Sequence, residues 1–236
     1  MRPTIVFDFD GTLALGDGPI TAFARAIAES TGDARFIDRA DAALADFTTG
    51  ETDYRDGYDA VTRVATGDGV SAATIGAAYD LSRTLLGTAD ALVAPPAGIT
   101  EFLDRVGAHA RLVLATNAPG DGVTEVLTAW GIARAFEDFH FTVGKPAGLI
   151  PVLRDALARG PVLSVGDIVA LDLAPAQDLG ADTALVGATA ARSTASVTMR
   201  GSSLADLYDP IIAWVEAATS PTFSPPENPP SPERQN

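Results

Sequence analysis

The chain has 236 residues, of which 47% are hydrophobic, and its formal net charge is −15. This apolar content can bury a core and excludes wholesale disorder, and the length fits one large domain or a core with a modest insertion. The negative charge argues against binding to nucleic acid or anionic lipid, because both would be repelled. The absence of cysteine excludes disulfides, thiolate metal sites and a cysteine nucleophile.

Histidines and membrane signals are also scarce. The two histidines, His109 and His140, leave little room for a histidine-rich zinc site or a serine–histidine relay, and structural roles are expected for both. No apolar stretch approaches the roughly 18 residues of a membrane span. The first residues do not form a signal peptide, since Asp8 and Asp10 interrupt their apolar run. A soluble, cytoplasmic protein is therefore expected.

Short apolar runs of strand length recur along the chain, separated by segments with helical spacing. Strands are expected at residues 4–9, 111–115, 161–165 and 183–186, with a weaker candidate at 140–143. Amphipathic helices are expected around residues 99–106 and 123–130. Buried strands that alternate with helices indicate a parallel sheet covered on both faces. The sequence thus predicts a three-layer, Rossmann-like α/β core.

One region interrupts that alternation. Between residues 19 and 87 the apolar residues follow helical spacing in four successive sets. The sets are Ile20-Phe23-Ala24-Ile27, Ile37-Ala40-Leu44-Phe47, Tyr54-Tyr58-Val61-Ala65 and Ile75-Tyr79-Ser82-Leu86. We therefore expect a core at residues 1–14 and 95–219 and an inserted helical domain, the cap, at residues 15–94. Tyr54 and Tyr58 are expected to pack in the core of the cap.

The C-terminal segment, residues 220–236, contains six of the sixteen prolines and one large apolar residue, Phe223. This composition predicts a disordered tail. A proline-rich ligand for a partner domain is the alternative interpretation.

Two aspartates follow the first expected strand in the sequence Asp8-Phe9-Asp10-Gly11. Alternation places Asp8 and Asp10 on one face at the carboxyl end of a parallel strand, where open sheets bind ligands. Two neighbouring carboxylates repel each other, and a bound cation is the usual reason that they occur together. Taken alone, the pair is better explained as two solvated aspartates at a polar exit from the strand.

Further polar residues follow the later strands. Thr116 and Asn117 end the strand at 111–115, where a hydroxyl and backbone amides can hold phosphoryl oxygens. Asp167 follows the strand at 161–165, and Asp172 lies five residues on, giving a second acidic pair. Lys145 is the only lysine, against fifteen arginines. A compact ammonium suits a position between a carboxylate and a phosphate.

In chain order, DFDGTL, ATN, GKP and GDIVALD resemble the four motifs of the haloacid dehalogenase-like (HAD) superfamily of hydrolases, over residues 4–186. The place and helical character of the insertion are similar to the type-1 cap of phosphoglycolate phosphatase-like and β-phosphoglucomutase-like members. Two departures concern the substrate: Lys145-Pro146 is followed by Ala-Gly-Leu, and Leu13 by Ala-Leu-Gly-Asp-Gly. Both differ from the commoner patterns of the superfamily.

The resemblance implies a role for each matched residue. Asp8 would be the nucleophile that forms an aspartyl-phosphate, and Asp10 the general acid and then the general base. Thr116, the backbone of Asn117 and Lys145 would hold the phosphoryl group.

A magnesium ion is the implied cofactor. Its ligands would be the Asp8 carboxylate, the main-chain carbonyl of Asp10 and Asp167, with Asp172 in support. Dehalogenase members lack an acid two residues after the nucleophile, so Asp10 favours phosphate chemistry.

The expected function is Mg²⁺-dependent hydrolysis of a small phosphorylated metabolite, without nucleic-acid or membrane partners. A sugar phosphomutase of the same superfamily is the first alternative. A signalling phospho-acceptor or a non-catalytic binding protein is the alternative from another class, although receiver domains place all their acidic residues before the threonine and lysine. One or two of six cap arginines are expected to contact substrate, with no basis for choosing among them: Arg25, Arg35, Arg39, Arg55, Arg63 and Arg83.

Overall fold

The protein is described by a computed structural model that covers residues 1–50 and 52–220. Apart from Ser220, the segment expected to be a disordered tail lies outside the described residues. None of the described helices combines the length and apolar composition that crossing a bilayer requires.

Six parallel strands form one sheet at the centre of the core. In spatial order they are β3 (Asp138–His140), β2 (Arg111–Ala115), β1 (Thr4–Phe7), β4 (Val162–Gly166), β5 (Asp182–Leu185) and β6 (Met199–Arg200). Phe7 at the end of β1 is opposite Leu114 of β2 and Val165 of β4. The residues that follow these three strands therefore emerge together at one edge of the sheet.

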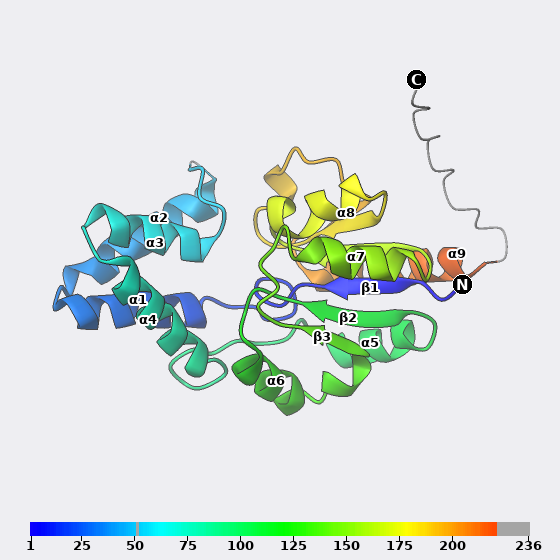
Figure 1. The fold of residues 1–236 in the computed structure, drawn as a ribbon, viewed down its shortest axis with the longest axis horizontal. Coiled ribbons are helices and arrows are strands. Elements are labelled where there is room, and N and C mark those ends of the chain that lie inside the picture. The colour runs from blue at the N-terminus through cyan, green and yellow to red at the C-terminus, as the bar shows by residue number, and fades with distance from the viewer. Residues whose placement is uncertain (51, 221–236) are drawn as a thin grey trace, which may run out of the picture.

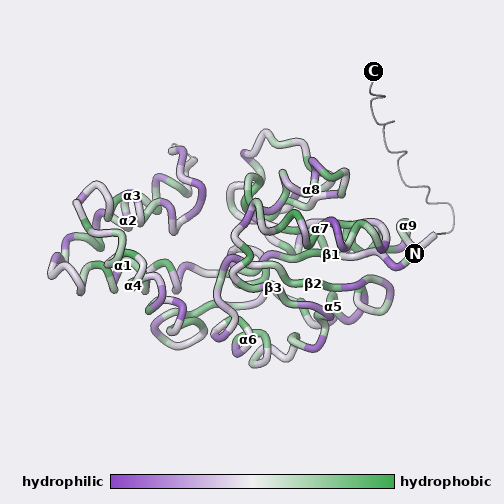
Figure 2. The backbone as a smooth tube through the Cα atoms, viewed as in Figure 1, coloured by the Kyte–Doolittle hydropathy of each residue, from purple (hydrophilic) through white to green (hydrophobic). Residues whose placement is uncertain are grey.

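Helices cover both faces of the sheet, as the alternating pattern predicts (Figure 1). They are α5 (Ile99–Gly107), α6 (Gly120–Ala129) and α9 (Tyr208–Thr219) on one face, and α7 (Leu149–Leu157) and α8 (Ala174–Asp178) on the other. Successive side chains of a strand point to opposite faces. Ile5 and Phe7 accordingly pack in the α5–α6–α9 layer, whereas Val6 packs against α7 and α8. The apolar residues concentrate along β1 and β2 between the two layers (Figure 2). The three-layer α/β prediction is confirmed.

Some strand limits differ from the prediction. Strand β1 ends at Phe7, two residues earlier than expected, because the chain turns there and the Phe9 carbonyl accepts hydrogen bonds from the N–H groups of Leu13 and Ala14. Strand β3 ends at His140, where the weaker candidate was expected to begin. Strand β6 has two residues and no apolar run, so no sequence pattern predicts it.

Four helices make up the insertion: α1 (Gly18–Thr31), α2 (Arg35–Thr49), α3 (Gly57–Gly67) and α4 (Ala72–Thr84). They share a separate apolar cluster around Phe23, Ile27 and Phe36. Tyr58 packs at the edge of this cluster, whereas Tyr54 lies outside it and has the Arg63 guanidinium 5.4 Å from its ring centre.

The two segments that connect the cap to the core run side by side. Leu15 and Ala94 exchange a pair of backbone hydrogen bonds of 2.9 Å each. Gly18 lies so close to this crossing that a Cβ atom there would be 2.3 Å from the Leu92 carbonyl oxygen. Both connections therefore reach the core next to the loop that follows β1.

Candidate active site

Three aspartates meet at the carboxyl edge of the sheet. Asp8 follows β1 and donates its backbone N–H to the Val165 carbonyl at 2.9 Å, which fixes it beside the end of β4. Asp167 follows β4 directly, and Asp172 lies in a single wide helical turn over Val169–Leu173. One carboxylate oxygen from each lies within 4.8 Å of the others. The structure thus brings together three of the four predicted acidic side chains.

Glycines make this close approach sterically feasible. Gly11 has a φ of +75°, and a Cβ there would lie 2.3 Å from Asp167 Oδ2. Gly166 would place a Cβ 2.4 Å from the Cβ of Asp172. Larger residues at either position would push the carboxylates apart.

Lys145 lies between two of the carboxylates. Its Nζ atom is 2.5 Å from Asp8 Oδ1 and 2.7 Å from Asp172 Oδ1, and its side chain is only 3% exposed. The backbone N–H of Lys145 donates to Asn117 Oδ1 at 2.8 Å. Asn117 therefore holds the lysine loop through its side chain, a role that the sequence did not predict.

Asp172 is engaged at both carboxylate oxygens. Oδ1 accepts a hydrogen bond from the Lys145 ammonium at 2.7 Å, and Oδ2 accepts one from the Ile168 backbone N–H at 3.0 Å. The Ser164 hydroxyl donates to the Asp172 carbonyl at 2.8 Å. These contacts suit a residue that orients Lys145 and supports a metal site, while Asp8 and Asp167 retain oxygens for direct ligation.

The electrostatics of this cluster favour a bound cation. Burial and the neighbouring carboxylates of Asp8 and Asp172 raise the pKa of Asp167 well above its ordinary value. Burial and Asp8 also raise the pKa of Asp172 to about 7, although Lys145 opposes the change. Burial would lower the pKa of Lys145, but the carboxylates of Asp8 and Asp172 raise it instead. One ammonium therefore does not balance the crowded negative charge.

A hard divalent cation fits the donor set. All three side chains offer carboxylate oxygens, which are the ligands that Mg²⁺ prefers. Asp167 Oδ1 is buried without a hydrogen-bond partner among the described residues. A buried, unpaired carboxylate oxygen is costly unless a cation or donor faces it.

Thr116 and Asn117 lie beside the carboxylates at the end of β2 and line the same cleft. The Thr116 hydroxyl oxygen accepts the Ala118 N–H at 3.0 Å, which leaves the hydroxyl hydrogen free to donate. Asn117 Oδ1 accepts the Lys145 backbone N–H, whereas the backbone N–H of Asn117 is available to an anion.

Asp10 lies apart from the three-aspartate cluster and is paired with the cap. Arg83, near the end of α4, donates from Nη1 to Asp10 Oδ1 at 2.9 Å and to the Tyr58 hydroxyl at 3.0 Å. The Arg83 side chain is 2% exposed. Burial raises the pKa of Asp10, and the guanidinium opposes that change.

Arg83 is one of the six cap arginines, and the sequence pattern does not single it out as a site residue. A signal was present, because Arg83 lies four residues after Tyr79 and so falls on the apolar face of its helix. An arginine on a buried face is rarely found without a partner. Others of the six, such as Arg39 and Arg63, pair with aspartates at the surface of the cap.

A cleft of about 450 Å³ lies between the cap and the core and contains all these groups except Arg83. The core contributes all seven predicted site residues: Asp8, Asp10, Thr116, Asn117, Lys145, Asp167 and Asp172. The cap side contributes mainly aromatic, apolar and acidic residues, among them Phe47, Asp56, Tyr58 and Tyr79. A substrate in this cleft would be in contact with both domains.

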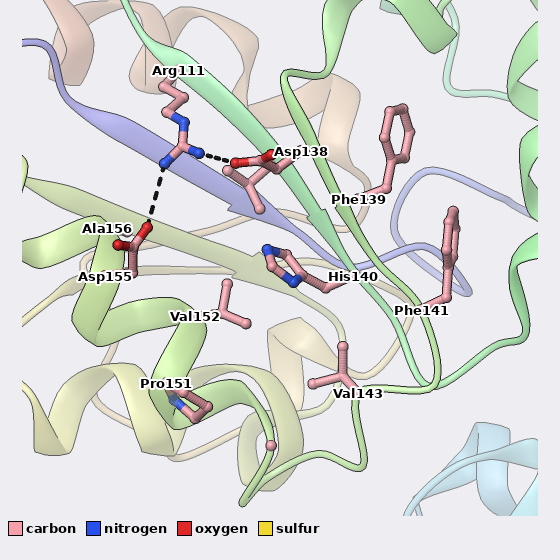
Figure 3. Close-up of a pocket in the computed structure, with 12 residues that line it drawn as sticks. Arg111, Asp138, Phe139, His140, Phe141, Val143, Pro151, Val152, Asp155 and Ala156 are labelled. Carbon is pink, nitrogen blue, oxygen red and sulfur yellow. Dashed lines mark hydrogen bonds and ion pairs between the residues drawn. The ribbon is translucent and has the colours of Figure 1, made fainter.

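A second hollow of about 510 Å³ lies at the outer edge of the sheet, between β3 and α7 (Figure 3). Arg111 forms ion pairs there with Asp138 and Asp155. Burial and Arg111 lower the pKa of His140, which lines this hollow. Since none of the predicted site residues reaches it, the paired charges are best explained as a link between the edge strand and α7. His140 thus lies outside the cleft.

Solved structures with the same fold span nearly the whole chain. A HAD phosphatase from Thermococcus onnurineus superimposes with a TM-score of 0.61 at 17% identity, covering 89% of this chain and 97% of that chain. YfnB from Bacillus subtilis, assigned to the HAD hydrolases and bound to magnesium, superimposes with a TM-score of 0.59 at 17% identity. The match covers 90% of this chain and 99% of YfnB. A 2-haloacid dehalogenase from Pseudomonas syringae superimposes with a TM-score of 0.54 at 16% identity. The match covers 91% of this chain and 100% of the dehalogenase.

No family model matches the sequence, and comparison with curated proteins found no match. The structural relatives include a phosphatase and a dehalogenase, so the fold alone does not select the reaction. At this level of identity the comparison concerns architecture, and the architecture agrees with the motifs. The chain has the fold of the haloacid dehalogenase-like hydrolases.

Proposed function

We propose that the protein is a Mg²⁺-dependent phosphatase that hydrolyses a small-molecule phosphomonoester through an aspartyl-phosphate on Asp8. The observation that carries this proposal is the position of Lys145, whose ammonium touches the Asp8 carboxylate at 2.5 Å inside the acidic cluster. A carboxylate can approach a phosphate dianion only where positive charge offsets the repulsion.

In the first half of the reaction, an Asp8 carboxylate oxygen attacks phosphorus and the bond to the leaving oxygen breaks. Asp10, two residues on and in the same cleft, donates a proton to the leaving alcohol. In the second half, Asp10 accepts a proton from water, which attacks phosphorus and releases phosphate and free Asp8. Each proton that Asp10 gives is thus recovered.

The other residues position the transferring group. The Thr116 hydroxyl and the Asn117 backbone N–H donate to phosphoryl oxygens, and Lys145 neutralises charge on them and on Asp8. Asp172 and Asn117 hold Lys145 in place through the contacts described above. Phosphoryl transfer depends on such positioning and charge neutralisation more than on complex covalent chemistry.

Asp8, Asp167 and the Asp10 main-chain carbonyl would hold the magnesium ion, with Asp172 in support. When bound, the ion supplies positive charge that stabilises the phosphoryl oxygens during transfer.

Asp10 favours a phosphatase over a dehalogenase. A departing halide needs no proton, so an acid–base group at this position would have no task in dehalogenation. Buried Arg83 forms an ion pair with Asp10 and holds its carboxylate in the cleft. A phosphomutase would use the same groups and differs only in the final acceptor.

A panel of phosphomonoesters, scored by released phosphate with Mg²⁺ and with excess EDTA, tests this function. Release that depends on Mg²⁺ and is lost in Asp8→Asn is the expected result. Turnover that requires a bisphosphate primer and yields an isomerised product would instead identify a phosphomutase. Full turnover in EDTA would contradict the proposal.

A further inference from the structure

The walls of the cleft differ in charge between core and cap. The cap side carries two carboxylates, Asp17 just before α1 and Asp56 just before α3. Among the described residues that line the cleft, Lys145 is the only basic one. The part of the cleft that would face a leaving group is therefore acidic, and no cation in its lining opposes that charge.

The basic residues close to the reaction site are already engaged. Arg55 and Arg192 line an adjoining hollow that includes Asp167; Arg55 forms an ion pair with Asp59, and Arg192 donates to the Thr48 carbonyl. Lys145 contacts Asp8 and Asp172, as a group acting on the phosphoryl oxygens should. Arg83 is bound to Asp10 and the Tyr58 hydroxyl and is absent from the described lining of the cleft. Neither Lys145 nor Arg83 is therefore placed to bind a carboxylate or a second phosphate on the leaving group.

Asp56 is a carboxylate without an ion-pair partner among the described residues. Its Oδ1 accepts the Asp59 backbone N–H at 2.7 Å as the cap of α3. Burial raises the pKa of Asp56, although the Asp59 backbone N–H and the neighbouring Arg55 oppose the change, so burial outweighs the compensation of the charged form. A cationic or hydrogen-bond-donating ligand group would relieve this cost, whereas an anionic group would add to it.

Aromatic side chains complete the cap wall. Tyr58 and Tyr79 lie with their ring centres 5.5 Å apart, and both line the cleft with Phe47. Such rings pack against carbon, and their faces attract ammonium groups. Their hydroxyls can exchange hydrogen bonds with an alcohol.

We propose that the substrate's leaving group is cationic or uncharged, such as an amino alcohol or a polyol, and that leaving groups bearing a carboxylate or a second phosphate are rejected. The inference rests on the proposed phosphatase function and names its substrate class. Asp56 and Asp17 set the preference by charge, and the aromatic wall accepts the carbon skeleton. Rejection through like charge is an established route to specificity.

A series of three phosphonates that cannot be hydrolysed isolates the charge preference from turnover. These are 3-aminopropylphosphonate, 3-hydroxypropylphosphonate and 3-phosphonopropionate, which share a similar length and differ in the charge of the far group. Calorimetric titration of the full chain with Mg²⁺ is expected to show that the amine binds at least about tenfold more tightly than the carboxylate. Tighter binding of the carboxylate, or no binding of any of the three, would overturn the inference.

Variants test whether Asp56 sets the preference. Asp56→Asn removes the charge but keeps a good helix cap, so the fold of α3 is preserved. The affinity for the amine is expected to fall about fivefold or more, while that for the alcohol stays within about twofold. Asp41→Asn makes the same change of net charge at an exposed site of α2 outside the cleft and serves as the control. An unchanged amine-to-carboxylate ratio in Asp56→Asn would refute the assignment.

The corresponding esters separate this inference from the proposed function. Phosphoethanolamine, 2-hydroxyethyl phosphate and 2-phosphoglycolate are scored for released phosphate. Hydrolysis with phosphoglycolate preferred would keep the phosphatase and refute the charge preference. Discrimination among the phosphonates without hydrolysis of any ester would refute the phosphatase and support the preference.

Discussion

At the scale of single residues, the site depends on two buried cations that are held in different ways. Lys145 lies between carboxylates of the core, and Arg83 reaches Asp10 from the cap. Each contact is close to 3 Å or shorter, so small changes in side-chain shape should affect the reaction. An error of about 1 Å in such a site can cost a hundredfold in rate.

Lys145→Arg keeps the charge and changes the shape. A guanidinium is wide and planar, so it cannot occupy the point between Asp8 and Asp172 without displacing one of them. We expect kcat/KM to fall at least about tenfold, or roughly 1.4 kcal/mol of transition-state stabilisation. Steady-state kinetics beside Lys145→Ala provide the measurement. A kcat/KM of Lys145→Arg within about threefold of wild type would mean that charge alone suffices.

Arg83→Met removes the cation that faces Asp10. Loss of one partner leaves an uncompensated carboxylate, and the free energy of unfolding should fall by about 1–3 kcal/mol. The loss is smaller than for a fully buried pair because the Asp10 side chain is 35% exposed. We also expect at least about a tenfold loss in kcat/KM from misplacement of Asp10.

The matched variants are Tyr58→Phe, which deletes only the second partner of Arg83, and the double variant Arg83→Met with Asp10→Asn. Because the ion pair no longer exists after either single change, the effects on stability should not add. Additive losses in urea unfolding would show that Arg83 and Asp10 do not act together.

At the scale of elements, the helices of the cap are stabilised by local ion pairs. Asp59 in α3 lies between Arg55, 3.0 Å away, and Arg63, 2.9 Å away. Burial would raise the pKa of Asp59, but the Arg55 backbone N–H and the two guanidinium groups lower it below its ordinary 3.8. A lowered pKa means that the charged form stabilises the folded state.

Asp59→Asn should therefore reduce the free energy of unfolding by about 1 kcal/mol at pH 7, as expected for partly exposed partners. The stabilisation is present above the unfolded-state pKa and is lost as the pH falls through the lower folded-state value. Urea midpoints of wild type and variant should hence converge as the pH falls towards 3. Asp53→Asn, at a carboxylate 87% exposed, is the control and should have little effect. A pH-independent difference between wild type and Asp59→Asn would contradict this account.

The elements were largely predictable because their signals are local. Four runs of apolar residues gave β1, β2, β4 and β5 to within one or two residues, and helical spacing gave the four cap helices. Strand β3 was misplaced because its residues are only half-buried and mix polar with apolar types. A two-residue strand such as β6 leaves no pattern to detect.

At the scale of the whole molecule, the motifs indicated which core residues would meet, because parallel strands deliver their following residues to one edge. The contacts between domains were not predictable in the same way. Arg83 and Asp10 are 73 residues apart, and their pairing depends on how the cap packs on the core. Asn117 also holds the Lys145 loop, and this role likewise depends on a contact between residues that are 28 positions apart in the sequence.

Asp8 is proposed to be the residue that becomes phosphorylated. The direct measurement is acid quenching of the enzyme during turnover with Mg²⁺, followed by mass spectrometry of the peptide that contains Asp8 and Asp10. We predict a single acyl-phosphate on Asp8, absent in Asp8→Asn and absent when EDTA precedes the substrate. A phosphoryl group trapped on any other residue, or an unchanged rate of phosphate release by Asp8→Asn, would contradict the account.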